Sequence, residues 1–432
     1  MKLRDGLLRG ASLSLLIRLS GIALSWLSVV TLTRLLGADG YGAYAFLLSA
    51  VLLLSLPATF GTPTLLVREV SAAQATRNWG RMRGAILWSV RFSLVMSLPI
   101  AGTAIILLVF FPQLISPVMR SGLMWAVILI VLSPLAAIRG GILRGLQQVA
   151  LGQAPEQLVR PLALIALLFL PMIWGGEIRD PGGAMAANVG AMVIAWLAGM
   201  AALAFFWPKE ADAARPEYDG RRWRASLMPL GLTSAMFLID SEVGVLLLGL
   251  IASHTETGIF KGATQFALLA SLGYTVVNVN ITPRIGAAVA RGDLAETQKV
   301  VTRGSRLSVA LCLPVVLTLI VFGPWAVPFI LGSDFKDAWA PLTILCMGQL
   351  VNAAFGSASA VLSMSHNERA SLVGFGVGLA VSIVLTLIMA PMFGAVGAAT
   401  AAMVSVILRN LILWRYAWVR MGIETGFWGR RG

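Results

Sequence analysis

Apolar positions occur in long runs that short polar segments interrupt, and this pattern extends over the whole chain. The runs are about 20 residues long, which is the length that a helix needs to cross the hydrocarbon core of a bilayer. Lipid cannot satisfy free backbone groups, so each spanning segment is a helix or part of a closed barrel. Strands of about ten alternating residues are absent, which leaves helices. The pattern predicts twelve spans, at residues 11–33, 41–60, 84–111, 120–142, 155–174, 182–207, 225–250, 257–282, 303–331, 338–363, 369–390 and 393–418.

Composition supports a membrane protein and argues against an enzyme. Of the 432 residues, 58% are hydrophobic and 12% are charged, whereas a soluble domain carries about 25% charged residues. No P-loop, Ser-His-Asp grouping or metal-ligand spacing is visible, and no polar segment is long enough for a catalytic domain. We therefore expect an all-α polytopic membrane protein that is not an enzyme. No cofactor or metal is predicted, and coupling to protons or sodium ions remains open.

Basic residues indicate the orientation of the chain. If the N-terminus is cytoplasmic, 25 of the 33 Lys and Arg residues fall in inner segments, Arg139, Arg160 and Arg409 among them. The five in outer segments are Arg34, Arg120, Arg179, Lys261 and Lys336. This bias follows the positive-inside rule and predicts that both termini are cytoplasmic. It explains the net charge of +14 without nucleic-acid binding, because the inner basic residues are spread over several segments and form no single patch.

An internal repeat divides the chain into two halves. The stretches 91-RFSLVMSLPI-100 and 306-RLSVALCLPV-315 share the pattern R-x-S-x4-L-P. The longest polar segment lies between them and predicts three parts: an N-terminal six-helix lobe at 1–207, a cytoplasmic linker at 208–224 and a C-terminal six-helix lobe with a short basic tail at 225–432. Because six is even, both lobes enter the membrane from the same side, so the repeat is parallel. Transporters built from such repeats bind substrate between the halves.

Arg18 is the first candidate site residue, because a charge inside a span costs roughly 2.5–3.5 kcal/mol on insertion scales. It lies on a helical stripe of small and polar residues: Ser14, Arg18, Gly21, Ser25 and Ser28. This stripe is predicted to face a watery cavity, where a guanidinium group can bind phosphate through two hydrogen bonds. The structural alternative is an ion pair with Asp240 or Glu242, or an arginine that reaches the membrane surface.

Other polar residues inside the spans complete the candidate site. Arg91 and Arg306 occupy equivalent positions in the repeat, and they either gather phosphates at the inner entrance or anchor the helices to the cytoplasmic face. Asp240 and Glu242 either take a proton or Na⁺ during transport or pair with arginines. They are two residues apart, so they point in different directions on a helix. The predicted sugar-binding or helix-packing residues are Tyr274, Asn278, Gln349 and Asn352.

The segment 34-RLLGADGYGAYAF-46 is predicted to form a tight outer turn with its tyrosines at the membrane interface. Together with Arg18, it resembles the start of bacterial polysaccharide-biosynthesis flippases of the multidrug/oligosaccharidyl-lipid/polysaccharide exporter (MOP) superfamily. The segments 257-TGIF-260 and 283-PRIGAAVARGD-293 are similar to their second half. The stretch 18-RLSG-21 resembles an arginine motif of lipid II flippases, which implies that Arg18 contacts pyrophosphate. Those flippases have fourteen helices, whereas this chain has room for only twelve. This difference favours the oligosaccharide branch of the superfamily.

The resemblance implies a flippase in the bacterial cytoplasmic (inner) membrane. It would move an undecaprenyl-pyrophosphate-linked oligosaccharide from the inner to the outer leaflet by alternating access, in surface polysaccharide export. The implied partners are the lipid-linked glycan, the membrane and other polysaccharide assembly proteins. The alternatives are a cation-coupled multidrug exporter of the same superfamily and a membrane scaffold of glycan assembly that transports nothing. A drug exporter for cations favours an acidic cavity, whereas Arg18 makes this one basic.

Overall fold

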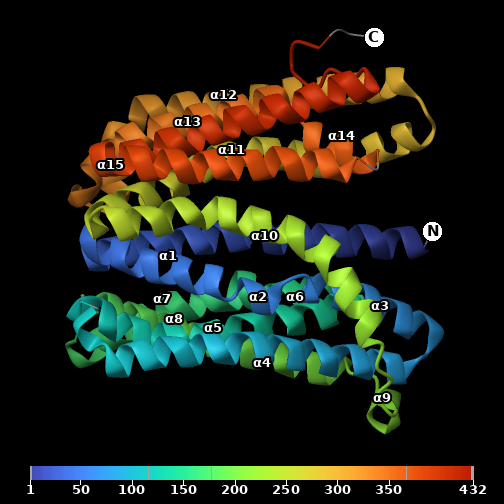
Figure 1. Ribbon diagram of the computed structural model, residues 1–432, viewed down its shortest axis with the longest axis horizontal. Helices are drawn as coiled ribbons and strands as arrows, with labels where there is room; N and C mark the ends of the chain where they lie inside the picture. Colours follow the sequence, from blue (N-terminus) through green and yellow to red (C-terminus); the bar gives the residue numbers. More distant parts are fainter. Residues whose placement is uncertain (1, 115, 177, 366, 430–432) are drawn as a thin grey trace. The chain divides into compact units, whose positions relative to one another are not determined.

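A computed structural model describes residues 2–114, 116–176, 178–365 and 367–429, and the regular elements in this part of the chain are helices (Figure 1). They form two compact units, Met1–Leu238 (unit 1) and Ile239–Gly432 (unit 2). The boundary falls within α10 (Gly220–Ile251). Before α10, unit 1 contains α1 (Lys2–Leu54), α2 (Leu56–Thr59), α3 (Thr62–Thr76), α4 (Trp79–Phe110), α5 (Pro117–Gly145), α6 (Val149–Ala154), α7 (Arg160–Phe169), α8 (Pro181–Phe206) and α9 (Glu210–Ala213). After α10, unit 2 contains α11 (His254–Ala290), α12 (Leu294–Leu331), α13 (Trp339–Phe355), α14 (Ala358–Met364) and α15 (Glu368–Met421).

Ten helices in the described residues are long and apolar enough to cross a membrane, and the two longest apolar segments, in α1 and α15, have 39 and 53 residues. The apolar part of α1 has 39 residues, which at 1.5 Å per residue extends about 58 Å, close to twice the roughly 30 Å of hydrocarbon. Non-helical glycines interrupt both long helices, Gly37 (φ 68°) in α1 and Gly394 (φ 54°) in α15. Figure 1 shows the chain reversing within each. The ten helices therefore accommodate the twelve predicted spans, and the all-α polytopic fold is confirmed.

The predicted turn at 34–46 is shorter than expected. Gly37 alone leaves the helical region, and helix resumes over Asp39-Gly40-Tyr41. The prediction that the tyrosines lie at the membrane interface is wrong, because Tyr41 and Tyr44 are only 2% and 3% exposed. Their rings stack with centroids 6.4 Å apart inside unit 1. The turn therefore contributes aromatic packing to the core.

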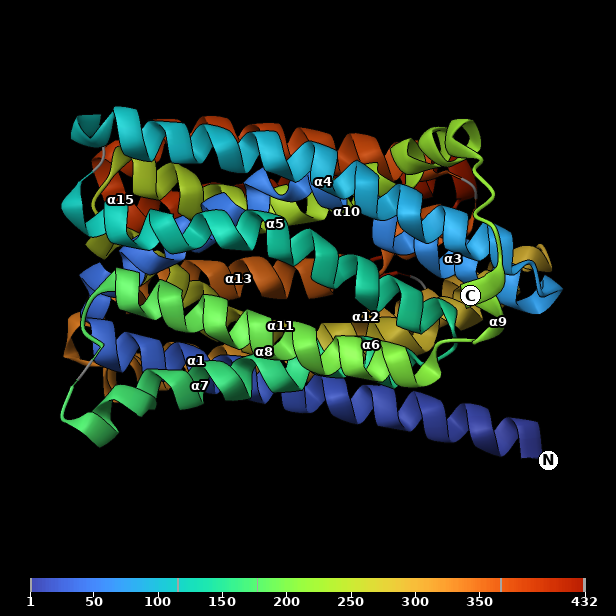
Figure 2. The same cartoon turned by 90° about the horizontal axis from the view of Figure 1, so that it is seen from below.

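Several other predicted spans are interrupted. The span predicted at 155–174 consists of a π-helical turn at Pro155–Val159, then α7, then a 3-10 segment at Leu170–Trp174. The span predicted at 338–363 is divided into α13 and α14 by Gly356, which has a φ of +70°. A π-helical turn adds one residue to a helical turn and is frequent at functional sites. Figure 2 shows α7 beside α1, where the two helices are in contact.

The repeat motif contributes the buried faces of two helices, α4 and α12. In α4 the buried residues spaced by four are Ser89, Ser93 and Ser97. Their repeat equivalents in α12 are Gly304, Ser308 and Cys312, and all three are buried. Small residues allow neighbouring membrane helices to approach closely. The repeated sequence is therefore explained by the same packing requirement in both units.

Candidate functional site

The stripe on α1 does not stay together as one polar face. Gly21 packs against the π-helical turn, where a Cβ atom would lie 2.8 Å from the Cβ of Gln157. Ser28 is buried and donates to the carbonyl oxygens of Leu24 and Pro161 at 2.9 and 3.4 Å. Arg18 and Ser25 are exposed on the surface of unit 1, and the side chain of Ser14 lies outside the described residues. The small residues thus serve packing, while Arg18 and Ser25 are accessible.

A charged network that the sequence did not reveal lies inside unit 1. Arg139 is 1% exposed, and its Nη2 donates to Glu156 Oε1 at 3.1 Å. Glu156 also lies 3.9 Å from Arg160 Nη1. Arg160 donates to the Asn188 side-chain oxygen at 3.1 Å, and Asn188 in turn donates to the Tyr44 hydroxyl at 2.7 Å. The unit 1 network therefore comprises Arg139, Glu156, Arg160, Asn188 and Tyr44.

Arg139 and Arg160, which the sequence analysis counts with the inner residues, both lie within apolar helices long enough to span a membrane. Arg139 also donates to the carbonyl oxygens of Ala195 and Trp196. A buried guanidinium needs a paired carboxylate and further acceptors to offset its lost hydration. The signal in the sequence was Glu156 at the start of an apolar run, four residues before Arg160.

Asp240 is ion-paired inside unit 2. Arg409 Nη1 lies 2.7 Å from Asp240 Oδ2 and joins α15 to α10. The Arg409 guanidinium also lies 4.8 Å from the centroid of the Phe375 ring, a distance at which a cation is attracted to the ring face. Arg409, which the sequence analysis counts with the inner residues, lies inside the long apolar helix α15. The acid and its partner are thus both within the spans.

Glu242 has a different partner. Lys261 Nζ lies 3.0 Å from Glu242 Oε2, and the two side chains are 13% and 12% exposed. The sequence had placed Lys261 in an outer segment, whereas it lies on α11 facing α10. Asp240 and Glu242 therefore point to α15 and α11, as their spacing of two residues predicted, and they form two separate ion pairs.

Three of the four predicted sugar-binding residues join side-chain hydrogen bonds in unit 2. Tyr274 hydrogen bonds with Asn278 one turn away on α11 and lies within electrostatic range of Arg409. Asn278 accepts a hydrogen bond from Ser357. Asn352 accepts from Asn410 Nδ2 at 3.0 Å, and Gln349 is half-buried on α13. We call Asp240, Arg409, Tyr274, Asn278 and Ser357 the unit 2 network.

Arg91 and Arg306, which occupy equivalent positions in the repeat, each contact a segment that follows the last apolar helix of their own repeat. The guanidinium of Arg91 lies 5.8 Å from the ring centroid of Tyr218, in the segment before α10. Arg306 donates to the carbonyl oxygens of Phe427 and Gly429 at 3.0 and 3.1 Å, in the segment after α15. We call residues 215–219 and 424–429 the closing segments of units 1 and 2. Each follows the last apolar helix of its repeat and lies against the helix that carries the motif arginine.

Further hydrogen bonds fix both closing segments. The amide of Glu217 donates to the carbonyl oxygen of Gly80 at 3.0 Å. In unit 2, Ser305 Oγ donates to the carbonyl oxygen of Thr425 at 2.6 Å. Each motif arginine therefore has a structural contact with the closing segment of its own unit.

The sequence of this chain matches the model of a known protein family. The family model described as "Polysaccharide biosynthesis protein" matches residues 7–289, which is more than half of the chain. The protein belongs to the polysaccharide biosynthesis protein family. One relative is the "Probable low-salt glycan biosynthesis flippase Agl15" of Haloferax volcanii, which is 22% identical over 401 residues. The alignment covers 91% of this chain and 79% of the relative's chain. The family resemblance expected from residues 34–46 is confirmed.

Solved structures of transporters share the fold of this polysaccharide biosynthesis protein. An inward-facing multidrug resistance MATE family transporter of the MOP superfamily aligns with a TM-score of 0.75 and 14% identity, over 94% of this chain and 98% of that one. The lipid II flippase MurJ, in an inward closed conformation, aligns with a TM-score of 0.71 and 14% identity, over 96% of this chain and 88% of that one. At these identities the likeness establishes the fold alone.

Proposed function

We propose that the protein is a flippase that moves an undecaprenyl-pyrophosphate-linked oligosaccharide from the inner to the outer leaflet of the cytoplasmic membrane. The observation that carries this proposal is the ion pair of Asp240 with Arg409 inside apolar helices. Ionisable residues within spans are costly, and they mark substrate and ion pathways. The family and the glycan flippase among the relatives favour a glycan over a drug.

The substrate's chemistry matches the accessible polar groups. A pyrophosphate needs cationic donors, and Arg18 is exposed for that role. Sugar hydroxyls need donors and acceptors, which Ser25, Tyr274, Asn278, Gln349 and Asn352 carry. Arg91 and Arg306 assist at the inner mouth. The polar headgroup passes between the lobes by alternating access while the lipid tail stays in the bilayer, so sugars never enter hydrocarbon.

We also propose that the unit 2 network couples transport to an ion. A proton on Asp240 neutralises the carboxylate that holds Arg409 at 2.7 Å. The released guanidinium then binds pyrophosphate, so protonation and substrate binding favour the same state. Glu242 and Lys261 provide a second pair that can respond to a proton or to Na⁺. An imposed proton or sodium gradient across proteoliposomes is expected to change the rate, and the effective gradient identifies the ion.

The direct test is transport by the purified protein in liposomes. A fluorescent oligosaccharide on undecaprenyl pyrophosphate should become accessible to a membrane-impermeant quencher faster than in empty liposomes. Arg18→Glu should reduce this rate by at least tenfold, while Arg120→Glu, a charge reversal at another exposed arginine, should not. Unchanged flipping by Arg18→Glu would remove Arg18 from the site, and no flipping by the wild type would contradict the proposal.

The multidrug exporter is the second candidate, because a MATE family transporter has the same fold with a TM-score of 0.75. The same liposomes separate the two functions when ethidium replaces the glycan lipid. Ethidium movement that depends on the protein, with no glycan flipping, would favour the exporter. Neither activity from a correctly folded protein would favour a scaffold that acts with other polysaccharide assembly proteins in the membrane.

A further inference from the structure

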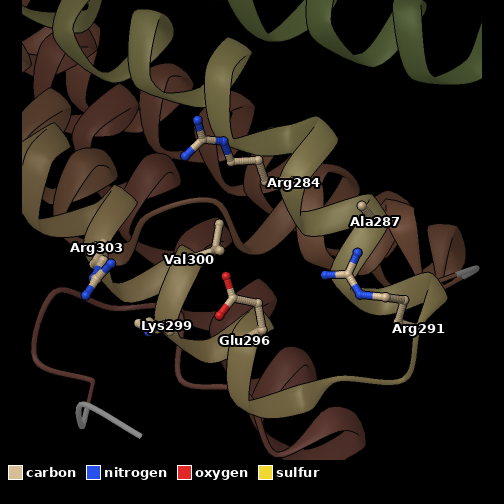
Figure 3. A pocket seen from close by; sticks show the side chains of 7 residues that line it. All are labelled: Arg284, Ala287, Arg291, Glu296, Lys299, Val300 and Arg303. Carbon is tan, nitrogen blue, oxygen red and sulfur yellow. The ribbon is translucent and has the colours of Figure 1, made fainter.

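A basic hollow lies at the turn between α11 and α12, within unit 2 (Figure 3). Its volume is about 320 Å³, and the residues that line it are Arg284, Ala287, Arg291, Glu296, Lys299, Val300 and Arg303. Figure 3 shows Glu296 near the centre, with Arg284, Arg291, Lys299 and Arg303 around it. We expected the inner basic residues to form no single patch, and that expectation is wrong for these four.

Helix geometry explains why the side chains converge. On α11, Arg284, Ala287 and Arg291 follow a spacing of three and four, which places them on one helix face. On α12, Glu296, Val300 and Arg303 follow the same spacing, with Lys299 beside them. Gly292, with a φ of +71°, reverses the chain between the two helices. The reversal brings the two faces together and leaves the hollow between them.

The charges around the hollow are not balanced. Four cationic side chains surround one carboxylate, which gives a formal charge of +3. Within the described residues, none of the four cations has an ion-pair partner within 4.0 Å. The amino end of α12 adds positive potential, although Asp293 caps it by accepting from the Glu296 amide at 2.9 Å. Arg68 and Arg81 of unit 1, in contrast, share Glu69.

Like charges held together repel one another, so a convergent cluster of this kind favours an anion in its centre. Arginine donors match phosphate oxygens through paired hydrogen bonds, and lysine adds a point charge. One water occupies about 30 Å³ in the liquid, so the hollow is large enough for a phosphate or a diphosphate. Five of its seven lining residues are charged, and the other two are Ala287 and Val300.

We infer that this hollow is a binding site for a phosphate group, distinct from Arg18 and from the unit 2 network. Phosphate chemistry of this kind comes from three sources: the diphosphate of a lipid-linked glycan, the headgroup of an anionic phospholipid, or a free phosphate. The inference does not depend on the proposed transport, because binding is measurable without movement across the membrane.

The test uses the full chain in nanodiscs of phosphatidylcholine, with inorganic pyrophosphate as the probe in isothermal titration calorimetry. Arg291→Gln combined with Lys299→Gln should raise the Kd at least tenfold. Arg221→Gln combined with Arg222→Gln removes the same charge from exposed positions at the start of α10 and should leave the Kd unchanged. Glu296→Gln should lower the Kd severalfold, because it removes the one carboxylate that repels phosphate.

A second arm identifies the source. Phosphatidylglycerol retained by the protein, measured by native mass spectrometry, should fall in the Arg291→Gln, Lys299→Gln variant if the ligand is a phospholipid headgroup. Loss of either pyrophosphate or phosphatidylglycerol binding in that variant supports the site. If that variant does not fold, Arg284→Gln with Arg303→Gln tests the opposite side of the hollow. Equal binding of both probes by the wild type, the hollow variants and the α10 control would overturn the inference.

Discussion

Arg409 Nη1 lies 2.7 Å from Asp240 Oδ2, and this ion pair joins two residues of α15 and α10 that are 169 positions apart in the sequence. The pair is partly buried, with side chains 13% and 25% exposed. In such surroundings neither charge is fully hydrated, so each depends on the other. The pair is therefore a structural link within unit 2.

Asp240→Asn should lower stability and abolish flipping. The substitution leaves Arg409 without its carboxylate, and we expect a loss of about 1–2 kcal/mol, below the 3–5 kcal/mol of a fully buried pair because water reaches both groups. The melting temperature in detergent and the liposome assay measure the two effects. Asp337→Asn, at an exposed acid, is the matched control. If Arg409→Gln in the Asp240→Asn background restores neither stability nor folding yield, the two residues do not act as a pair.

Glu156→Gln should be more harmful alone than together with Arg139→Met. The single change leaves the buried Arg139 guanidinium without an ionised partner, which costs about 3–5 kcal/mol. The double variant replaces the pair by neutral groups of similar volume, so part of the stability should return. Thermal unfolding of both variants and of Arg139→Met completes the double-mutant cycle. Additive losses would show that the carboxylate does not stabilise Arg139.

Acid should weaken the junction of α3 and α4. Burial disfavours the charged form of Glu69, but hydrogen bonds and positive charge from Arg81 and Arg68 outweigh it and hold the pKa of Glu69 below its ordinary value. A lowered folded-state pKa gives stability that is present above the unfolded value, about 4.3, and is lost as the pH falls through the folded value. The melting temperature should therefore drop between pH 6 and pH 3, and Glu69→Gln should flatten this part of the profile. An identical acid profile in Glu69→Gln would contradict the assignment.

Gly394→Ala should destabilise unit 2. Gly394 has a φ of +54°, and an added Cβ would lie 2.3 Å from Glu256 Oε2, which accepts the Ala395 amide at 2.6 Å. Backbone strain of this kind costs about 1–3 kcal/mol, before the clash is counted. Gly102→Ala in α4 is the control, because a Cβ there meets nothing within 4 Å. Equal melting temperatures for the two variants would show that the reversal in α15 does not require glycine.

The spans were predictable because apolar length is a local property of the sequence. Residues 11–33 and 41–60 were correctly separated, although the structure needs only Gly37 between them. The charged networks were not predictable in the same way. Arg139 and Arg160 were counted with the inner basic residues, so their ion pairs with Glu156 were missed. Their pairing depends on which helices pack together, and Glu156 with Arg160 was the only local indication.

The candidate site also combines features that the sequence predicted with features that it did not. The separate orientations of Asp240 and Glu242 followed from helical spacing alone. Their partners did not, because Arg409 is 169 residues from Asp240 and Lys261 is on the next helix, 19 residues from Glu242, so neither pair leaves a periodic signal. The basic hollow is an intermediate case. Its residues follow helical spacing in both α11 and α12, but only the turn at Gly292 brings the two faces together.

The closing segments give an order to biosynthesis. Residues 215–219 lie against α4, so the closing segment of the first repeat has been translated before α11 is made. Residues 424–429 lie against α12, so the second repeat must wait until after α15 is made. During that interval the first half of α12 lacks its contact with residues 424–429, and Arg306 lacks the carbonyl oxygens of Phe427 and Gly429.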